Sequence, residues 1–145
     1  MSFGQSSRTT AGGFPRVADA DPCPCGSGER FDGCCAPLHR GTPAPTPERL
    51  MRSRYTAFVV GDADYLAATW HPGTRPDDLD LDPDQRWTRL EILDVAGGGD
   101  GEKRGVVEFR AHWRYGDDAG ELHERSRFVR QSGRWWYLDG EFPAA

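Results

Sequence analysis

Long apolar runs are missing from this chain of 145 residues, in which no run of hydrophobic residues is longer than four. A membrane-spanning helix needs about 20 consecutive apolar residues, so a transmembrane protein is excluded. The first 20 residues also lack the apolar stretch of a secretory signal peptide. We therefore expect a cytoplasmic protein with no membrane partner.

Positive charge is also scarce. The 18 basic residues are outnumbered by 23 acidic ones, which gives a formal net charge of −5 at pH 7. Domains that bind nucleic acid normally carry an excess of basic charge, so nucleic acid is not expected as a partner. Nearly all of the basic residues are arginine, and this bias runs through the whole chain, which indicates codon usage rather than a binding patch.

The composition divides the chain into four parts. Residues 1–20 are rich in Ser, Gly, Thr and Ala without any hydrophobic period, which predicts a disordered leading segment. Residues 21–40 contain all four cysteines, and residues 41–47 hold three alternate prolines that favour extended backbone and predict a semi-rigid linker. Residues 48–145 are long enough to form the main domain.

The cysteines form one tight cluster in the sequence. They are Cys23, Cys25, Cys34 and Cys35. Four thiolates are the ligand set of a closed tetrahedral zinc site, and Gly26 and Gly28 let the chain turn sharply after the first pair. Disulfides between the pairs and four free thiols are the alternatives. A reducing cytoplasm disfavours disulfides, and so short and polar a segment offers no core in which free thiols could be buried.

Residues 48–60 have the hydrophobic spacing of an amphipathic helix. Thr46 can cap this helix, Pro47 suits its first position, and Gly61 ends it. Asp62 can cap a second, shorter helix that Pro72 stops. The stretch 72–86, rich in proline and aspartate, predicts a loop.

From residue 87 onward the hydrophobic period changes to two, as in strands with one buried face. The first strand begins around Leu90, and three more follow at 107–115, 122–131 and 134–142, separated by glycine-containing turns. On the second strand, residues from Val107 to Tyr115 alternate between apolar and polar. Two helices followed by a four-stranded antiparallel meander predict an α+β domain with its helices on one face of the sheet.

The cysteine segment has a recognisable pattern. Cys23-Pro-Cys25-Gly-Ser-Gly28, then Phe31 and Cys34-Cys35, resembles the SEC-C motif, a zinc-binding appendage found on the translocase motor ATPase and on several unrelated proteins. The resemblance implies one structural zinc ion held by the four cysteines, with no coordination position left open for catalysis. The fourth ligand of the family is Cys or His. Because Cys35 fills that position, we expect His39 to be a surface histidine.

The main domain resembles a second family. Its matching segments are 50–58, Tyr65-Leu66 with Trp70-His71, 122–128, and Trp136-Tyr137 with Asp139-Gly140. Together with the cysteines they resemble the YchJ family of uncharacterised bacterial proteins over residues 22–142. The resemblance implies a nuclear transport factor 2-like fold, a cone in which a curved antiparallel sheet wraps around helices, preceded by an N-terminal zinc knuckle. It implies no reaction, because the family has no established activity.

Curved sheets of this type often enclose a cavity. Strand alternation places Glu124 and Ser126 on the inward face of the third strand. A carboxylate on an apolar wall is costly unless it is paired, so Glu124 either forms an ion pair with Arg54 or Arg52 or serves as an acid–base group. The residues predicted to line the cavity are Tyr55, Trp70, Trp113, Glu124 and Ser126.

Two functions compete at this point. In the first, the zinc knuckle presents a small surface to a protein partner, made of Arg30, Phe31, His39 and Arg40. In the alternative, the cavity is the site of a small-molecule isomerase or hydrolase in which Glu124 is the general base, assisted by Ser126 or His71. The second rests on analogy with other cone folds, and the sequence lacks paired carboxylates, so we favour the first. A homodimer formed through the sheet is compatible with either.

Overall fold

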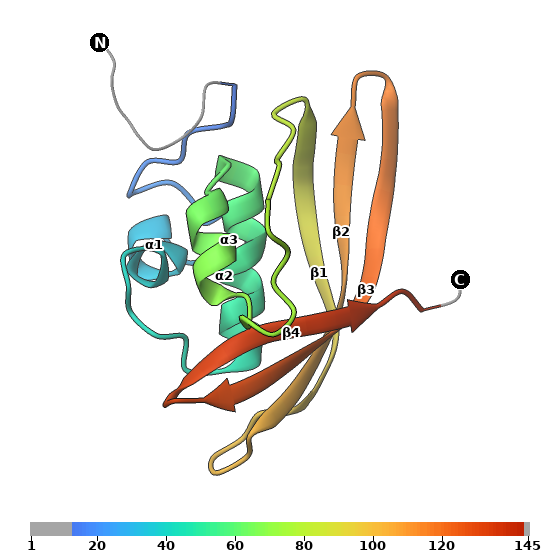
Figure 1. Cartoon of the computed structure of the whole chain (residues 1–145). Helices are drawn as coiled ribbons and strands as arrows, with labels where there is room; N and C mark the ends of the chain where they lie inside the picture. Colours follow the sequence, from blue (N-terminus) through green and yellow to red (C-terminus); the bar gives the residue numbers. More distant parts are fainter. Residues whose placement is uncertain (1–12, 144–145) are drawn as a thin grey trace.

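A computed structural model describes residues 13–143. Along the chain these residues form a short 3-10 turn η1 (Phe31–Gly33), the helices α1 (Cys35–His39), α2 (Pro47–Val60) and α3 (Ala63–Thr69), and the strands β1 (Gln85–Gly97), β2 (Arg104–Tyr115), β3 (Asp118–Gln131) and β4 (Arg134–Glu141). The strands make one antiparallel sheet in the order β1-β2-β3-β4, with all three helices on one side of it (Figure 1). The predicted α+β architecture is confirmed.

Helix α2 begins and ends where its local signals predict. The Thr46 hydroxyl accepts a hydrogen bond from the backbone N–H of Arg49 at 3.1 Å, and Pro47 occupies the first turn. Gly61 ends the helix in the left-handed region, with φ of 78°. A Cβ at Gly61 would lie 2.5 Å from the ring of Phe14, so the close approach of the leading segment also requires glycine here.

Helix α3 is joined to the last strand. The Asp62 side chain caps its N-terminus by accepting from the N–H of Tyr65 at 3.0 Å. At its other end Trp70 forms an isolated bridge with Tyr137 of β4, and the His71 N–H donates to the Tyr137 carbonyl at 2.8 Å. In the part of the chain that the structure describes, no helix is long and apolar enough to cross a membrane.

The sheet bends where its pairing register shifts. Shifts occur twice between β1 and β2, at 87–89 and 92–94, and once between β3 and β4, at 127–128. Such bulges bend a strand and increase its local twist. The turn between the strands predicted at 107–115 and 122–131 is shorter than expected, because strand pairing already begins at Asp118.

The core lies between α2 and the sheet. Val107, Phe109 and Ala111 of β2 are buried, as their alternation predicts. The apolar side chains are not buried up to the end of β2: Tyr115 is 46% exposed. The tip of the β2–β3 hairpin extends beyond the helices (Figure 1). The largest side chain that is fully buried is Phe128 of β3.

The cysteine segment is part of this same core. All four cysteines belong to the buried cluster that contains Leu50 and Tyr55 of α2, and Val17 packs against it. Figure 1 shows α1 beside α2, on the side away from the sheet. Residues 13–20 therefore make defined contacts, unlike the disordered segment predicted for 1–20, whose residues 1–12 lie outside the described range. The predicted knuckle is packed on the domain rather than suspended from a linker.

Candidate metal centre

The four cysteine sulfurs converge on one point. Their Sγ atoms all lie within 4.8 Å of one another, and the four residues are at most 5% exposed. The Sγ atoms of Cys25 and Cys34 are 3.6 Å apart. In a tetrahedral site with Zn–S bonds of about 2.3 Å, neighbouring sulfurs lie about 3.8 Å apart. All four cysteines are free thiols, and small movements would close them around one metal ion.

Short turns bring the two cysteine pairs together. The N–H of Cys23 donates to the Glu29 carbonyl at 2.9 Å, and that of Gly26 donates to the Cys23 carbonyl at 3.1 Å. Gly26 and Gly28 have φ of 79° and 88°, a left-handed conformation that a side chain would strain. The second pair lies where η1 gives way to α1, at Cys34 and Cys35. The glycines predicted to turn the chain do so.

Hydroxyl groups contact the sulfurs from two sides. Thr56 of α2 donates to Cys35 Sγ at 3.4 Å, and its hydroxyl oxygen is 3.8 Å from Cys23 Sγ. The Ser27 hydroxyl oxygen is 3.1 Å from Cys34 Sγ. Groups of this kind orient metal ligands and stabilise their charged form. Helix α2 therefore contributes directly to the cysteine site.

Two arginines of α2 bind backbone carbonyls of the cysteines. Arg52 Nη1 donates to the Cys25 carbonyl at 2.7 Å, and Arg49 Nη2 donates to the Cys34 carbonyl at 3.2 Å. Arg52 also pairs with Glu48 at 3.0 Å. Four thiolates around a divalent ion leave a net negative charge, which these guanidinium groups would offset.

The packed sulfurs differ in their affinity for protons. Hydrogen bonds from Cys23 and Cys35 hold the pKa of Cys25 far below its ordinary value. Hydrogen bonding to Cys23 and Cys25, together with burial, raises the pKa of Cys35, and burial raises the pKa of Cys34 to about 11. One thiolate thus makes its neighbours harder to ionise. A bound cation would remove that conflict by favouring all four thiolates.

The surface predicted to meet a protein partner is only partly available. Phe31 is 9% exposed and belongs to the core, and the ring of His39 lies 4.5 Å from that of Tyr65. His39 Nε2 donates to the Ser53 carbonyl at 2.8 Å, and burial lowers the pKa of His39. His39 is therefore not the surface histidine that the sequence predicts.

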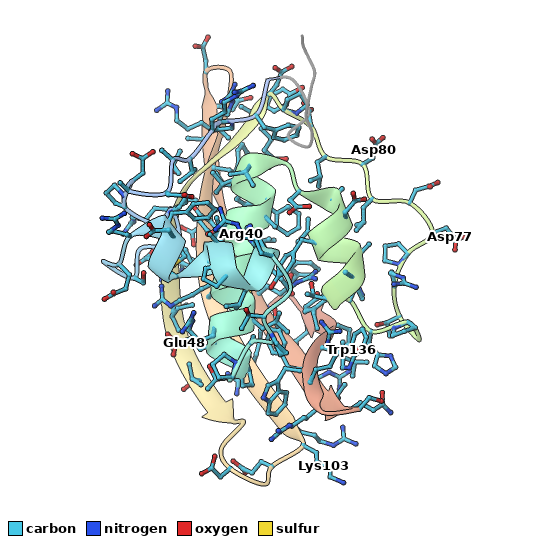
Figure 2. The ribbon with its side chains drawn as sticks, turned by 90° about the vertical axis from the view of Figure 1, so that its left-hand side faces the viewer. Arg40, Glu48, Asp77, Asp80, Lys103 and Trp136 are labelled. Atoms are coloured by element: carbon cyan, nitrogen blue, oxygen red, sulfur yellow. The ribbon has the colours of Figure 1, made fainter. Side chains whose placement is uncertain are left out.

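The other two residues of that predicted surface are exposed. The side chains of Arg30 and Arg40 are each 63% exposed, and they pair with Asp32 at 2.8 Å and Asp19 at 3.2 Å. Figure 2 shows Arg40 at the end of α1, on the side of the helices away from the sheet. Binding of a partner through these two arginines stays a prediction.

Two of the three candidate catalytic residues are brought together, and the third is not. Ser126 donates to Glu124 Oε2 at 2.6 Å, and the Tyr137 hydroxyl donates to the same oxygen at 2.9 Å. His71, at the end of α3, bonds instead to the Gln131 side chain at 2.6 Å and is not among the cavity-lining residues. Within residues 13–143 no ion pair joins Glu124 to an arginine. Of the two alternatives, a direct ion pair does not form in the described part of the chain: the Tyr137 hydroxyl of β4 bonds to Glu124. Burial lowers the pKa of Arg54, and the charge of Glu124 opposes this only from a greater distance.

A cavity of about 170 Å³ lies between the helices and the sheet. Its lining includes four of the five predicted residues, and the full set is Met51, Arg54, Tyr55, Phe58, Trp70, Trp87, Phe109, Ala111, Leu122, Glu124, Ser126 and Tyr137. Trp113 is absent from this lining. It packs over Gly120, where a Cβ would lie 2.6 Å from its ring.

The sequence contained a signal for contacts that our predictions missed. Arg49, Arg52, Ser53 and Thr56 are spaced three and four apart, so they form one polar stripe along α2. Ser53 is fully buried, as is Thr56. A polar stripe that is buried needs polar partners. Arg49, Arg52 and Thr56 find theirs in the cysteine segment. Ser53 instead donates to the Leu50 carbonyl and contacts the Tyr65 hydroxyl.

The fold and the cysteine site together define the class of protein, an NTF2-like α+β domain with an N-terminal SEC-C-type cysteine cluster. Residues 46–140 match the family described as YchJ, middle NTF2-like domain. The chain belongs to the YchJ family. A UPF0225 protein of Streptomyces coelicolor is 60% identical over 122 residues, which cover 83% of this chain and 95% of that protein. A UPF0225 protein of Deinococcus radiodurans is 48% identical over 120 residues, covering 81% and 87%.

Solved structures resemble the whole arrangement. The solution structure of a SEC-C motif containing protein from Rhodopseudomonas palustris has a TM-score of 0.74 and 39% identity, covering 86% of this chain and 100% of that one. The crystal structure of a SEC-C motif containing protein from Psychrobacter arcticus has a TM-score of 0.71 and 27% identity, covering 88% and 85%. Both alignments are longer than the NTF2-like domain alone.

Proposed function

We propose that this protein binds one Zn²⁺ ion through its four cysteines and that the ion is structural. The observation that carries the proposal is the convergence of four buried sulfurs, all within 4.8 Å of one another. Four thiolates complete a tetrahedral zinc site and leave no position for water or substrate. The metal would therefore hold the chain together rather than act on a ligand.

The chemistry of the ligands supports zinc. A set of four sulfur donors selects soft or borderline metals, above all zinc and iron. Two solved relatives with this fold are described as SEC-C motif containing proteins. The proposal includes a cytoplasmic location, because a reducing compartment keeps the thiols available for metal.

The structural role follows from how the segment is held. Residues 13–40 contain two very short helical elements, and most of the apolar side chains that they bury belong to the core of the main domain, so the segment has no core of its own that could fold it. Metal binding contributes about 10–16 kcal/mol in short zinc peptides. With the metal in place, Thr56, Arg49 and Arg52 of α2 would bind a preorganised segment.

The test is elemental analysis combined with NMR on purified, reduced protein. We expect one zinc ion per chain, and we expect the amide signals of residues 13–40 to lose their dispersion when a chelator removes it. Cys25→Ser should abolish stoichiometric zinc, whereas the exposed control Arg30→Ala should retain it. Absence of stoichiometric metal, iron in place of zinc, or a segment that keeps its dispersed signals after chelation would each contradict the proposal.

Binding of a protein partner is the second candidate. The exposure of Arg30 and Arg40 beside a fixed metal site supports it, since their side chains are each 63% exposed. The double variant Arg30→Glu and Arg40→Glu should keep its zinc and lose any protein that crosslinks to the wild type. Equal crosslinking by variant and wild type would rule this surface out.

A further inference from the structure

The cavity of the cone contains two opposite charges that are not paired with each other. Arg54 of α2 is 3% exposed, and both Arg54 and Glu124 line the cavity. Among the described residues, neither takes part in an ion pair. Burial lowers the pKa of Arg54 to about 10, and the charge of Glu124 opposes this from beyond ion-pair distance. Because the two groups are not in direct contact, each keeps hydrogen-bonding capacity that the protein does not use.

Arg54 offers a free edge of its guanidinium group. Its Nη1 donates to the Leu66 carbonyl at 2.8 Å and to the Thr69 hydroxyl at 2.7 Å. Its Cζ lies 4.4 Å from the ring centroid of Tyr137 and 5.1 Å from that of Trp70, which stabilises the cation. In the described part of the chain, Nε and Nη2 make no hydrogen bond. These two donors form the side of an arginine that can grip a carboxylate with two parallel bonds.

Trp70 forms part of the same wall through its ring. The ring packs against the Arg54 guanidinium and the Tyr137 ring, and its indole Nε1–H is fully buried without a hydrogen-bond partner in the described structure. The free edge of Arg54 is therefore the group that indicates an anionic acceptor from outside the chain.

Glu124 presents the complementary group from the sheet. Its Oε2 accepts from Ser126 and Tyr137, whereas Oε1 has no hydrogen-bond partner among the described residues. The free oxygen can accept from a cationic donor. Apolar side chains, including Phe109 and Trp87, make up most of the rest of the lining.

The size of the cavity limits the ligand. Its volume is about 170 Å³, and a cavity of about 150 Å³ in another protein is known to hold benzene. A ligand of roughly six to nine non-hydrogen atoms is the scale that fits. A molecule of this size that contacts both Arg54 and Glu124 must carry a negative and a positive group on neighbouring atoms.

We propose that this cavity binds a small zwitterion, namely an amino acid with a short aliphatic side chain. Its carboxylate would bind Arg54 beside the Trp70 ring, its ammonium group would bind Glu124, and its side chain would lie against the apolar wall. A ligand with only a carboxylate would leave Glu124 unpaired and repelled. A ligand with only an ammonium group would do the same to Arg54. The site is separate from the cysteine cluster, so this proposal stands independently of zinc.

The first test compares three probes of similar shape by calorimetry and by NMR of the Trp70 indole. L-valine carries both charges, 3-methylbutanoate lacks the ammonium group, and 2-methylpropylamine lacks the carboxylate. We expect L-valine to bind at least about tenfold more tightly than either analogue, since a hydrogen bond to a charged group contributes about 1.5–3 kcal/mol. We also expect it to shift the indole signal. No binding of L-valine at millimolar concentration, or equally tight binding of an analogue, would overturn the proposal.

The second test removes the negative charge of residue 124 and keeps the hydrogen bonds that fix its side chain. Glu124→Gln keeps an oxygen that accepts from Ser126 and Tyr137, so we expect it to fold and to bind L-valine about tenfold more weakly. Its preference for L-valine over 3-methylbutanoate should narrow. Glu121→Gln is the matched control on the same strand, because Glu121 pairs with Arg110 at the surface. Equal affinity of both variants for L-valine would contradict the assignment of Glu124.

Discussion

Helix α2 carries arginines on two opposite faces, and the two faces differ in how fully these arginines find partners within the chain. One face holds the cysteine segment through Arg49, Arg52 and Thr56, and the opposite face lines the cavity with Arg54 and Tyr55. Arg52 binds a backbone carbonyl beside the cysteine cluster, whereas Arg54 is buried with part of its guanidinium group unused. On the cysteine side the polar groups of α2 find partners within the chain, and on the cavity side part of Arg54 does not. Substitutions on each side should therefore separate metal binding, stability and ligand binding.

The largest effect is expected from the sheet side of the core. Phe128 is 1% exposed, and Phe128→Ala should lower the free energy of unfolding by about 3–5 kcal/mol because it leaves a cavity. Zinc content should stay at one ion per folded chain, since Phe128 lies on β3 and takes no part in the hydrogen bonds that the described residues make to the cysteine sulfurs. Urea unfolding and elemental analysis measure the two quantities. Phe142→Ala, at a side chain that is 70% exposed, is the control that should change neither.

A smaller effect is expected where α2 meets the sulfurs. Thr56→Val removes the hydroxyl that donates to Cys35, and we expect metal affinity to fall by about 10–100-fold in chelator competition. Thr69→Val is the matched control, because it removes an equally buried hydroxyl that contacts Arg54 instead. Loss of affinity in both variants would show that general destabilisation, rather than the sulfur contact, is responsible.

A still smaller loss of stability is expected at the N-terminus of α2, and it should affect both faces of the helix equally. Thr46→Ala removes the N-terminal cap of α2 and should cost about 1 kcal/mol. Because the helix is shared, the loss should appear both in urea unfolding and in amide exchange of the cysteine segment and the cavity wall. Thr42→Ala, in the exposed loop before the helix, should be neutral. Faster exchange confined to one face would contradict the view that α2 unfolds as one unit.

The smallest effect concerns pH. Burial lowers the pKa of His39, so the fold favours its neutral form. The stability that neutral His39 contributes is fully present above the unfolded pKa of about 6.5, and it is lost as the pH falls through the lowered folded value. Below about pH 6.5 the wild type should therefore lose stability more steeply than His39→Gln. Urea unfolding between about pH 5 and 8 measures this difference.

His71→Gln is the comparison for that series. His71 lies outside the core, where it bonds to Gln131, so this variant controls for the replacement of a histidine that is not packed against α2. Loss of metal at low pH affects all three proteins alike and cancels in the comparison. Parallel pH profiles for the wild type and His39→Gln would rule out a contribution from His39.

Local signals made the secondary structure predictable. Thr46, Pro47 and Gly61 mark the limits of α2 without reference to the rest of the chain, and strand alternation identified the inward face that carries Glu124. The cysteine cluster was equally clear, because its residues are close in sequence as well as in space.

Contacts between distant segments could not be predicted. The hydroxyl of Tyr137 reaches Glu124 because β4 pairs with β3 in a register that a bulge shifts at 127–128. No local pattern encodes that shift. The burial of His39 depends on how α1 docks on α2, which places its ring against Tyr65. Residue patterns therefore predicted which face of each helix or strand is buried. Which side chains contact each other across elements depends on how those elements pack.

The shared use of α2 also limits which changes of chain length it can tolerate. An α-helix turns by about 100° per residue, so inserting or deleting one residue within Pro47–Val60 would rotate one face away from its target while the other stayed in place. Thr56 and Tyr55 could no longer serve the sulfurs and the cavity together. Natural variation in this helix should thus be confined to substitutions, with gaps collecting in the loop of residues 72–84, where the acidic side chains of Asp77 and Asp80 lie at the outer edge of the molecule (Figure 2).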